Sequence, residues 1–405
     1  MINILTNNKK FLMIIPLYTA LLLTACGGSS VKVKIDEDDL PVIEKPQTGI
    51  AGDGSLTDIV KYVRQHHDVP ALAAIMVHDG EIIEQAVSGS REYNKDTAVT
   101  LEDKWHLGSL TKSMTSTLAA QLVQQGAIQW DTKIGDVYAE LNSEMRDEYQ
   151  GVTLAQLLTH TSGMRANIPN LGDYHNKNNA ITEQRQELVE DALALTPAVS
   201  AGTYLYSNLG YIIAGAMMEK LTGMSWEELM EYNLFSSLEM NDAGFGAPDV
   251  KSDLSQPVGH ERSGSKWKPV KVTSSFIADN PEVLGPAGRV HASLADMAKY
   301  LVAHLQGARG EDVSGFLTAE EFAILHTPAE NTNYAMGWVV NTGQISHSGS
   351  NTTWLARMMI SADKNTALFV VINAADLNRS NSIVEQASEA LLLELVKRSN
   401  AAFDS

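Results

Sequence analysis

The order of strand-like and helix-like segments along the chain most constrains its fold. Two short apolar runs, at 71–77 and 82–87, flank an Asp79-Gly80 pair, and this arrangement predicts an antiparallel hairpin. The C-terminal part predicts four more strands and a final amphipathic helix, at residues 337–340, 344–348, 353–360, 367–372 and 382–396. Because strands come from both ends of the chain, we expect one sheet interrupted by a long insertion.

The middle of the chain has mostly helical spacing. Leu110, Met114, Leu118 and Leu122 recur every four residues, and Gly126 is placed to end this helix. Further helices are expected at 153–159, 208–221, 226–232 and 294–305, with polar loops at 167–180 and 263–268. The prediction is an α/β fold with an antiparallel sheet built from both chain ends and flanked by helices. Its domain spans 56–400, a mostly helical subdomain is inserted at about 125–290, and the site is expected at their junction.

The first 25 residues have the pattern of an export signal. Lys9 and Lys10 precede an apolar run over 11–23 that is too short to span a bilayer comfortably. The run closes on Leu23-Thr24-Ala25-Cys26, which resembles the lipobox of bacterial lipoproteins, and Cys26 is the only cysteine. We therefore predict a lipoprotein signal peptide at 1–25, a lipid anchor on Cys26 and a flexible tether at 26–55. A plain signal peptide that leaves Cys26 unmodified is the alternative.

This N-terminus implies an exported protein that is anchored to the membrane in the bacterial cell envelope. Gly27, not an aspartate, follows Cys26, which favours the periplasmic side of the outer membrane if the host has two membranes. A formal charge of −19 argues against nucleic acid as a partner. Metal-ligand spacings such as His-Glu-x-x-His and phosphate-binding or dinucleotide-binding fingerprints are missing from the sequence, so no metal or cofactor is expected. The pattern does not indicate an oligomeric state.

Ser109 and Lys112 form a Ser-x-x-Lys pair at the predicted start of a helix. Residues three apart on a helix share a face, so the hydroxyl and the amine can reach each other. A helix N-terminus favours developing negative charge, which would let the Ser109 N–H serve in an oxyanion hole. Lys112 can act as the base only if burial or a neighbouring cation lowers its pKa from the usual value of about 10.4. The pair alone is weak evidence, because Ser263 and Lys266 repeat it within a Gly/Ser loop.

Two further elements complete the candidate site. Tyr206-Ser207-Asn208 is a Tyr-x-Asn element, and Tyr174-His175-Asn176 matches it equally well. His347-Ser348-Gly349 lies on a predicted strand, where the glycine would let a substrate backbone approach the strand edge. His78-Asp79-Gly80 repeats that spacing, and Asn341-Thr342-Gly343 is a looser variant. Each element is therefore ambiguous by itself, and only their combination points to one site.

Taken together, the longer motifs around these elements resemble those of the serine penicillin-recognising enzymes. This group comprises class C β-lactamases, D-Ala-D-Ala peptidases, D-aminopeptidases and related esterases. The resemblance covers roughly 56–396, and its motifs lie at 105–115, 157–163, 202–211, 285–288, 334–338 and 347–351.

The resemblance implies a role for each matching residue. Ser109 would attack a carbonyl to form an acyl-enzyme, while Lys112 and Tyr206 would shuttle the proton. Asn208 would help to hold Lys112 and the substrate. The Ser350 N–H would complete the oxyanion hole together with that of Ser109.

The third element departs from the Lys-Thr-Gly that many of these enzymes carry. His347, which with Gly349 would contact the substrate, replaces a fixed positive charge by a group that is near neutral at pH 7. A β-lactam that bears a carboxylate should therefore be held less firmly. We predict a serine hydrolase for a small-molecule or peptide substrate, either an amide such as a D-amino-acid peptide or a small ester. A β-lactamase that hydrolyses β-lactam antibiotics and a catalytically silent envelope protein are the alternatives.

Each candidate residue also has an ordinary structural interpretation. Ser109 could be only a helix N-cap, and Tyr206 and Tyr211 could be half-buried aromatic residues. We interpret His160, in a Leu-Leu-Thr-His-Thr-Ser-Gly turn, as structural and exclude it from the site. For His347, substrate contact and strand packing are equally good interpretations. The agreement of several separate motifs favours catalysis over these interpretations.

Overall fold

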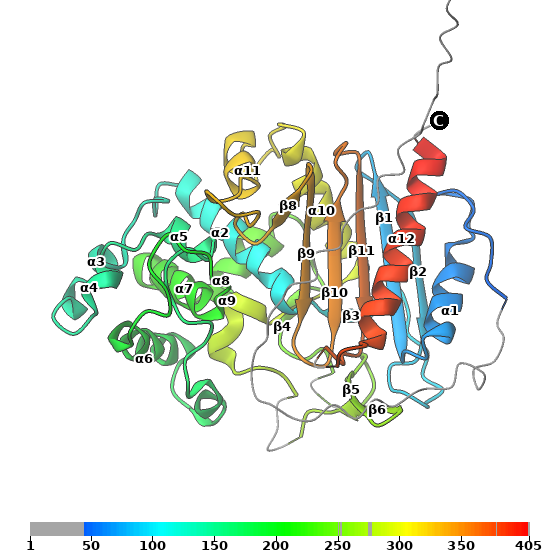
Figure 1. Ribbon diagram of the computed structural model, residues 1–405, viewed down its shortest axis with the longest axis horizontal. Coiled ribbons are helices and arrows are strands. Elements are labelled where there is room, and N and C mark those ends of the chain that lie inside the picture. Colours follow the sequence, from blue (N-terminus) through cyan, green and yellow to red (C-terminus); the bar gives the residue numbers. More distant parts are fainter. Residues whose placement is uncertain (1–43, 250, 252, 274–277, 378, 404–405) are drawn as a thin grey trace, which may run out of the picture. The chain divides into compact units, whose positions relative to one another are not determined.

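A computed structural model of the protein describes residues 44–249, 251, 253–273, 278–377 and 379–403. It contains a six-stranded antiparallel sheet with the strand order β2-β1-β11-β10-β9-β8. The strands are β1 (Ala71–His78), β2 (Glu81–Gly89), β8 (Val339–Asn341), β9 (Gln344–Ser350), β10 (Leu355–Ile360) and β11 (Thr366–Ile372). The prediction of one antiparallel sheet built from both chain ends is therefore confirmed (Figure 1).

Helices cover both faces of this sheet. α1 (Leu56–His66) and α12 (Ile383–Phe403) pack on one face, and α10 (Leu294–Ala308) packs on the other (Figure 1). Alternate residues of β1 enter the two cores, with Leu72 facing α1 and α12 and Ala73 on the α10 side. This burial on both sides explains why β1 is a continuous apolar run and not an alternating one.

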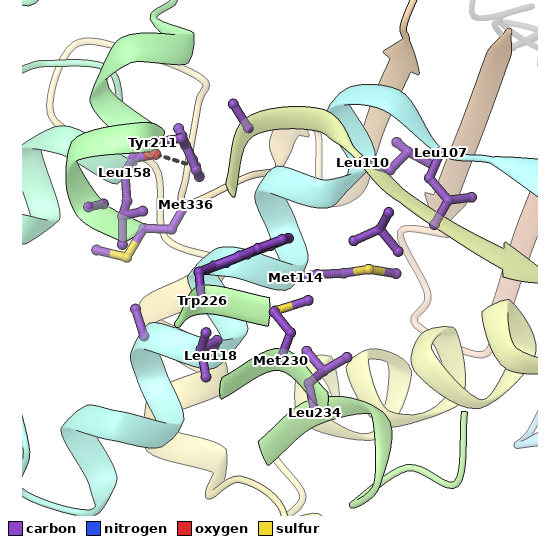
Figure 2. Packing of buried hydrophobic residues seen from close by; sticks show 14 of the residues in the cluster. Leu107, Leu110, Met114, Leu118, Leu158, Tyr211, Trp226, Met230, Leu234 and Met336 are labelled. Carbon is purple, nitrogen blue, oxygen red and sulfur yellow. Dashed lines mark hydrogen bonds between the residues drawn. The ribbon is translucent and has the colours of Figure 1, made fainter. Parts of the chain in front are cut away.

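The helix that follows Ser109 is the central element of the helical region. α2 (Thr111–Gln124) is buried on nearly every side along its first twelve residues. Figure 2 shows Leu110, Met114 and Leu118 packed with Trp226 and Met230 in the larger core cluster. This packing withdraws the start of α2, and the polar side chains on it, from water.

The remaining helical elements surround α2. α7 (Asn208–Thr222) begins with Ser207, whose hydroxyl accepts from the Gly210 N–H, and ends at the left-handed Gly223. The other α-helices are α3 (Ile134–Val137), α4 (Asp147–Gln150), α5 (Leu154–Leu158), α6 (Ile181–Ala194), α8 (Trp226–Leu229), α9 (Gly285–Gly288) and α11 (Ala319–Leu325). Short turns are η2 (Gly108–Leu110), η3 (Ala139–Leu141), η4 (Leu171–Asn176), the π-helical η5 (Met230–Phe235) and η6 (Glu282–Leu284).

The structure differs from the sequence prediction in the inserted region. The polar loop expected at 263–268 is wrong, because β5 (Gly259–Ser263) and β6 (Lys266–Val270) form a hairpin there. A small second sheet joins β3 (Lys104–His106), β7 (Val290–Ser293) and β4 (Gly244–Phe245) in the order β3-β7-β4. These strands are two to five residues long, which is too short to show a clear alternation of apolar and polar residues.

The predicted signal peptide, Cys26 and residues 26–43 of the tether lie outside the described residues. Among the helices of the described ranges, none has the length and apolar composition needed to cross a bilayer. The lipid anchor therefore stays a prediction from the sequence.

Candidate active site

Ser109 and Lys112 meet where η2 runs into α2. Ser109 is partly exposed, whereas the Lys112 side chain is fully buried. Lys112 Nζ donates to Ser109 Oγ at 3.1 Å and to the carbonyl oxygen of Ala287 at 2.6 Å. Leu110 occupies the N-cap position of α2, and no side chain caps this end, so Ser109 is not a helix cap. The arrangement presents the Ser109 hydroxyl to a ligand while it keeps the amine away from water.

The surroundings of Lys112 favour its neutral form. Burial lowers the pKa of Lys112 well below its ordinary value of 10.5. Its two acceptors, the Ser109 hydroxyl and the Ala287 carbonyl, carry no charge. The Tyr206 and Tyr211 ring centroids lie 4.9 and 5.6 Å from Nζ. A neutral amine within hydrogen-bonding distance of a serine hydroxyl can accept its proton.

Tyr206 is a neutral phenol beside the nucleophile. Burial raises the pKa of Tyr206, and a side-chain hydrogen bond with Ser109 offsets only part of that rise. The ring packs on His160, with 4.3 Å between centroids. His160 Nδ1 accepts from the Ser207 N–H at 3.1 Å, so this histidine supports the segment that carries Tyr206. A phenol with a raised pKa can donate a proton but is a poor base at neutral pH.

Asn208 lies at the first position of α7, and its side chain is engaged elsewhere. Its Nδ2 donates to Asn167 Oδ1 at 2.9 Å. No hydrogen bond joins Asn208 to Lys112 among the described residues, and the Ala287 carbonyl provides the second acceptor instead. A backbone carbonyl has no residue-type signature, so the sequence analysis did not identify this contact.

His347 is a buried, neutral group on β9. A hydrogen bond of 3.1 Å joins its Nε2 to the Tyr334 hydroxyl. Burial lowers the pKa of His347 to about 3. The site therefore lacks a fixed positive charge at this position. The sequence analysis missed Tyr334, although it lies in the 334–338 motif, because a tyrosine among apolar residues usually indicates a core position.

The end of β9 packs directly against η2. A Cβ added to Gly349 would lie 2.8 Å from the Ser109 nitrogen and still closer to the Leu107 carbonyl oxygen. Gly108, with a φ of 52°, approaches the Ser350 backbone in the same way. Glycine at 349 thus allows the close approach of the chain's own backbone. The amides of Ser109 and Ser350 lie on these two facing segments.

We expect Gly349→Ala to lower both stability and activity, because the added methyl group must push β9 away from η2. Overpacking of this kind should lower the thermal midpoint by about 2–5 °C. Ester hydrolysis should fall by about 100-fold, because the two amides separate. Gly151→Ala is the control, since its Cβ would meet nothing within 4 Å. Calorimetry and an ester assay measure both effects, and wild-type values in Gly349→Ala would contradict the expectation.

A buried ionic cluster anchors the segment that carries the Ala287 carbonyl. Arg185 on α6 is bonded to the carboxylates of Glu219 and Glu227 and donates to the Glu282 carbonyl at 3.2 Å. α9, which contains Ala287, directly follows the η6 turn that includes Glu282. Removal of one partner from such a cluster typically costs about 3–5 kcal/mol, so the position of the carbonyl is strongly constrained.

The competing copies of the short motifs lie at other places in the fold. Ser263 and Lys266 flank the turn between β5 and β6, and 174–176 lie in η4. The copy at 78–80 spans the turn between β1 and β2, and 341–343 spans the turn between β8 and β9. Within the described ranges, no group of three or more His, Cys, Asp or Glu side chains could hold a metal ion.

The comparison with protein families shows to which family the chain belongs. A family model described as Beta-lactamase matches residues 56–390, which is most of the chain. The chain belongs to the beta-lactamase family. This family supports a serine acyl-transferase or hydrolase kind of function, and the resemblance to serine β-lactamases and penicillin-binding proteins is confirmed.

Curated relatives of this beta-lactamase family member include two bacterial proteins. Penicillin-binding protein 4 of Amycolatopsis lactamdurans is 28% identical over 265 residues, which cover 65% of this chain and 66% of the relative. Protein flp of Staphylococcus aureus (strain MW2) is 22% identical over 320 residues, which cover 78% of this chain and 62% of the relative. The chain thus spans just under two thirds of the length of these relatives.

Solved structures share the fold. The octameric penicillin-binding protein homologue from Pyrococcus abyssi superposes with a TM-score of 0.64 at 21% identity, covering 85% of this chain and 78% of that one. SurE superposes with a TM-score of 0.67 at 20% identity, covering 86% and 75%. These similarities establish the architecture and leave the substrate to the chemistry of the site.

Proposed function

We propose that this protein is a serine hydrolase that cleaves an amide or ester through an acyl-enzyme, with Ser109 as the nucleophile. The observation that carries the proposal is the contact of 3.1 Å between Lys112 Nζ and Ser109 Oγ. Lys112 is fully buried, and its hydrogen bonds go to uncharged groups, so the amine is available as a base near neutral pH.

The proposed steps start with Lys112 as a neutral amine and Tyr206 as a protonated phenol. Ser109 Oγ bonds to the substrate carbonyl carbon while its proton passes to Lys112. The N–H groups of Ser109 and Ser350 donate to the oxyanion. When the bond to the leaving group breaks, that group takes a proton from the Tyr206 phenol, and Lys112 returns a proton to Tyr206. Water then attacks the acyl-enzyme by the same route and releases the acid.

The charge of the site supports a substrate that is uncharged where it meets His347. This imidazole has a pKa of about 3 and offers no cation to a carboxylate at neutral pH. Tyr204 is 41% exposed and its ring centroid lies 5.8 Å from that of Tyr334, so aromatic surface borders the site. We propose a small ester or a D-amino-acid peptide. A structural neighbour, SurE, was solved with D-Leu, which adds D-amino-acid derivatives to the substrates worth testing.

We expect an active-site phosphonate probe to add once to the full-length chain and not at all to Ser109→Ala. The partly exposed hydroxyl beside a neutral amine should react, and the alanine variant keeps the fold because it removes a single oxygen atom. Intact mass spectrometry measures the adduct, and circular dichroism shows that both proteins are folded. Equal labelling of both proteins would contradict the role of Ser109. No adduct on folded wild type would instead favour a catalytically silent envelope protein.

β-Lactam hydrolysis is the second candidate, supported by the family match and by the penicillin-binding protein relative. Without a cation at His347, we expect nitrocefin turnover per molecule at least about tenfold slower than hydrolysis of a good ester. Rapid nitrocefin turnover that disappears in Ser109→Ala would favour the β-lactamase.

We also propose that Cys26 carries the lipid that holds the enzyme in the cell envelope, on the periplasmic side of the outer membrane if the host has two membranes. The support is the sequence alone, namely the Leu23-Thr24-Ala25-Cys26 motif after an apolar run. Metabolic labelling with a fatty-acid analogue should mark the wild type and not Cys26→Ser. A labelled Cys26→Ser variant would contradict the anchor.

A further inference from the structure

A buried carboxylate lies behind the two facing segments of the candidate oxyanion hole. The side chain of Asp279 is fully buried. Its Oδ2 is 3.0 Å from His106 Nε2 and accepts from Arg289 Nε at 3.3 Å. Its Oδ1 accepts from Asn351 Nδ2 at 2.9 Å and from the Asn280 N–H at 2.8 Å. Four donors on a carboxylate use nearly all of its lone-pair positions, so the group has no freedom to rotate or shift.

One side of this network leads to the nucleophile. His106 Nδ1 accepts from the Gly108 N–H at 3.0 Å, which leaves Nε2 to donate to Asp279. Gly108 immediately precedes Ser109. The position of the Ser109 amide is therefore connected to Asp279 through a single imidazole.

The other side leads to β9. Asn351 follows Ser350 directly, and its Nδ2 donates to Asp279. Asn351 Oδ1 accepts from the Thr353 N–H at 3.2 Å and from its hydroxyl at 3.1 Å, which fixes the orientation of the amide. Asp279 is therefore bonded to His106, which holds the segment before Ser109, and to Asn351, which directly follows Ser350.

We propose that Asp279, with His106 and Asn351, positions the Ser109 and Ser350 amides at the spacing that the oxyanion needs. This inference rests on the proposed acyl-enzyme function. Donors in an oxyanion hole are effective only when they are held where the negative charge develops, and small displacements cost large factors in rate. We call these three residues the oxyanion clamp.

The charge balance around the clamp is consistent with this role. Although burial alone would raise it, the pKa of Asp279 is held well below its usual range by His106, Arg289 and Asn351. The carboxylate is therefore ionised at every pH at which the enzyme would work. The titratable or charged groups that face it are His106 on β3, Arg289 beside β7 and His291 on β7.

The first test is Asp279→Asn. The asparagine amide has only one oxygen, so it cannot accept from both Asn351 Nδ2 and His106 Nε2 in the present geometry. One of these two donors would therefore face the NH₂ group of the new side chain and lose its acceptor. We expect kcat for an ester to fall about 10- to 100-fold with KM within about threefold, because the amides act on the transition state. The affinity of a boronic acid, which forms a tetrahedral anionic adduct with serine, should fall in parallel.

Asp376→Asn is the matched control. Asp376 is also a buried carboxylate with several donors, accepting from Ser382 Oγ and from the N–H groups of Ile383 and Val384. It has no contact with His106 or Asn351 among the bonds of the described residues. Asp376→Asn should lose stability and keep kcat and boronate affinity, which separates a general loss of packing from the clamp.

A second variant, Asn351→Asp, keeps the proposal testable if Asp279→Asn does not fold. It sets two carboxylates about as close as the present contact of 2.9 Å, and such a pair cannot remain fully ionised. A shared proton at lower pH rebuilds the hydrogen bond, so the ratio of variant to wild-type kcat should rise as the pH falls from 8 to 6. A residue with a merely structural role would leave that ratio constant.

The outcomes are distinguishable. A wild-type enzyme that neither hydrolyses esters nor binds the boronic acid would overturn the proposed function, and the clamp with it. An active wild type combined with unchanged kcat and boronate affinity in folded Asp279→Asn would overturn the clamp alone. A constant kcat ratio across pH in folded Asn351→Asp would do the same.

Discussion

Lys112→Arg is expected to reduce ester hydrolysis by about 10³-fold or more, although it keeps a basic residue. Guanidinium groups stay protonated in proteins, so arginine cannot accept the Ser109 proton. The wild-type amine can, because burial lowers the pKa of Lys112 well below 10.5. The same reasoning gives the pH dependence. Because the reactive form of Lys112 is unprotonated, kcat/KM should rise with pH, and the midpoint of this rise should lie well below pH 10.5.

Two further variants make this test specific. Lys112→Met has a similar length and no charge, so it should fold and be as inactive as the arginine variant. Lys268→Arg is the control, because this side chain is 67% exposed and pairs only with Glu261 among the ion pairs of the described residues. Its kcat/KM should equal that of the wild type. Activity of Lys112→Arg or Lys112→Met within about tenfold of wild type would rule out Lys112 as the base.

Acid is expected to unfold the protein cooperatively between about pH 6 and pH 4. Burial lowers the pKa of four buried histidines from the usual 6.5. The pKa is about 4 for His260 and about 3 for His347, and it is shifted in the same direction for His160 and His304. Below pH 6.5 these histidines become protonated in the unfolded chain but stay neutral in the folded chain. Stability therefore falls as the pH falls through this window, by about 2 kcal/mol each at pH 5 for His260 and His347, and in the same direction for His160 and His304.

Losses of this size are a large fraction of the stability of an ordinary domain, which is about 5–15 kcal/mol. Buried carboxyls with raised pKa values, such as Asp296, act in the opposite sense, but their shifts are smaller. Urea midpoints followed by circular dichroism at several pH values measure the net slope. Replacement of one buried imidazole, in His304→Gln, should move the acid midpoint to lower pH, whereas the exposed His66→Gln should not. A urea midpoint that is flat from pH 6.5 to 4.5 would contradict this account.

Much of the sheet could be predicted because its signals are local. The hairpin of β1 and β2, and the strands β9 to β11, followed from apolar runs and an Asp-Gly turn within a few residues. The β5–β6 hairpin and the β3-β7-β4 sheet could not be recognised in the same way, because their strands are short and their partners are distant or polar. The helices α1 and α6 were also missed. The apolar pattern of α6 is weak, whereas α1 has a clear apolar face of Leu56, Ile59, Val60 and Val63 that the sequence analysis did not use.

The candidate site also combines contacts that are local in the sequence with contacts between distant segments. Spacing within one helical turn suffices to place Ser109 near Lys112, so the Ser-x-x-Lys pattern alone predicts that pair. The partners that complete it lie far along the chain: Ala287 is 175 residues from Lys112, and Asp279 is 173 residues from His106. No local pattern reports such contacts.

By itself, then, the sequence determined the strands at the two chain ends, the Ser-x-x-Lys helix and the family motifs, all of which depend on residues close together in the chain. Only the tertiary structure decided that Lys112 is buried from water, that His347 is neutral and that Gly349 faces the chain's own backbone. It also placed the buried carboxylate of Asp279 between His106 and Asn351. These properties arise from desolvation and from distances between remote segments, and both exist only once the chain is packed.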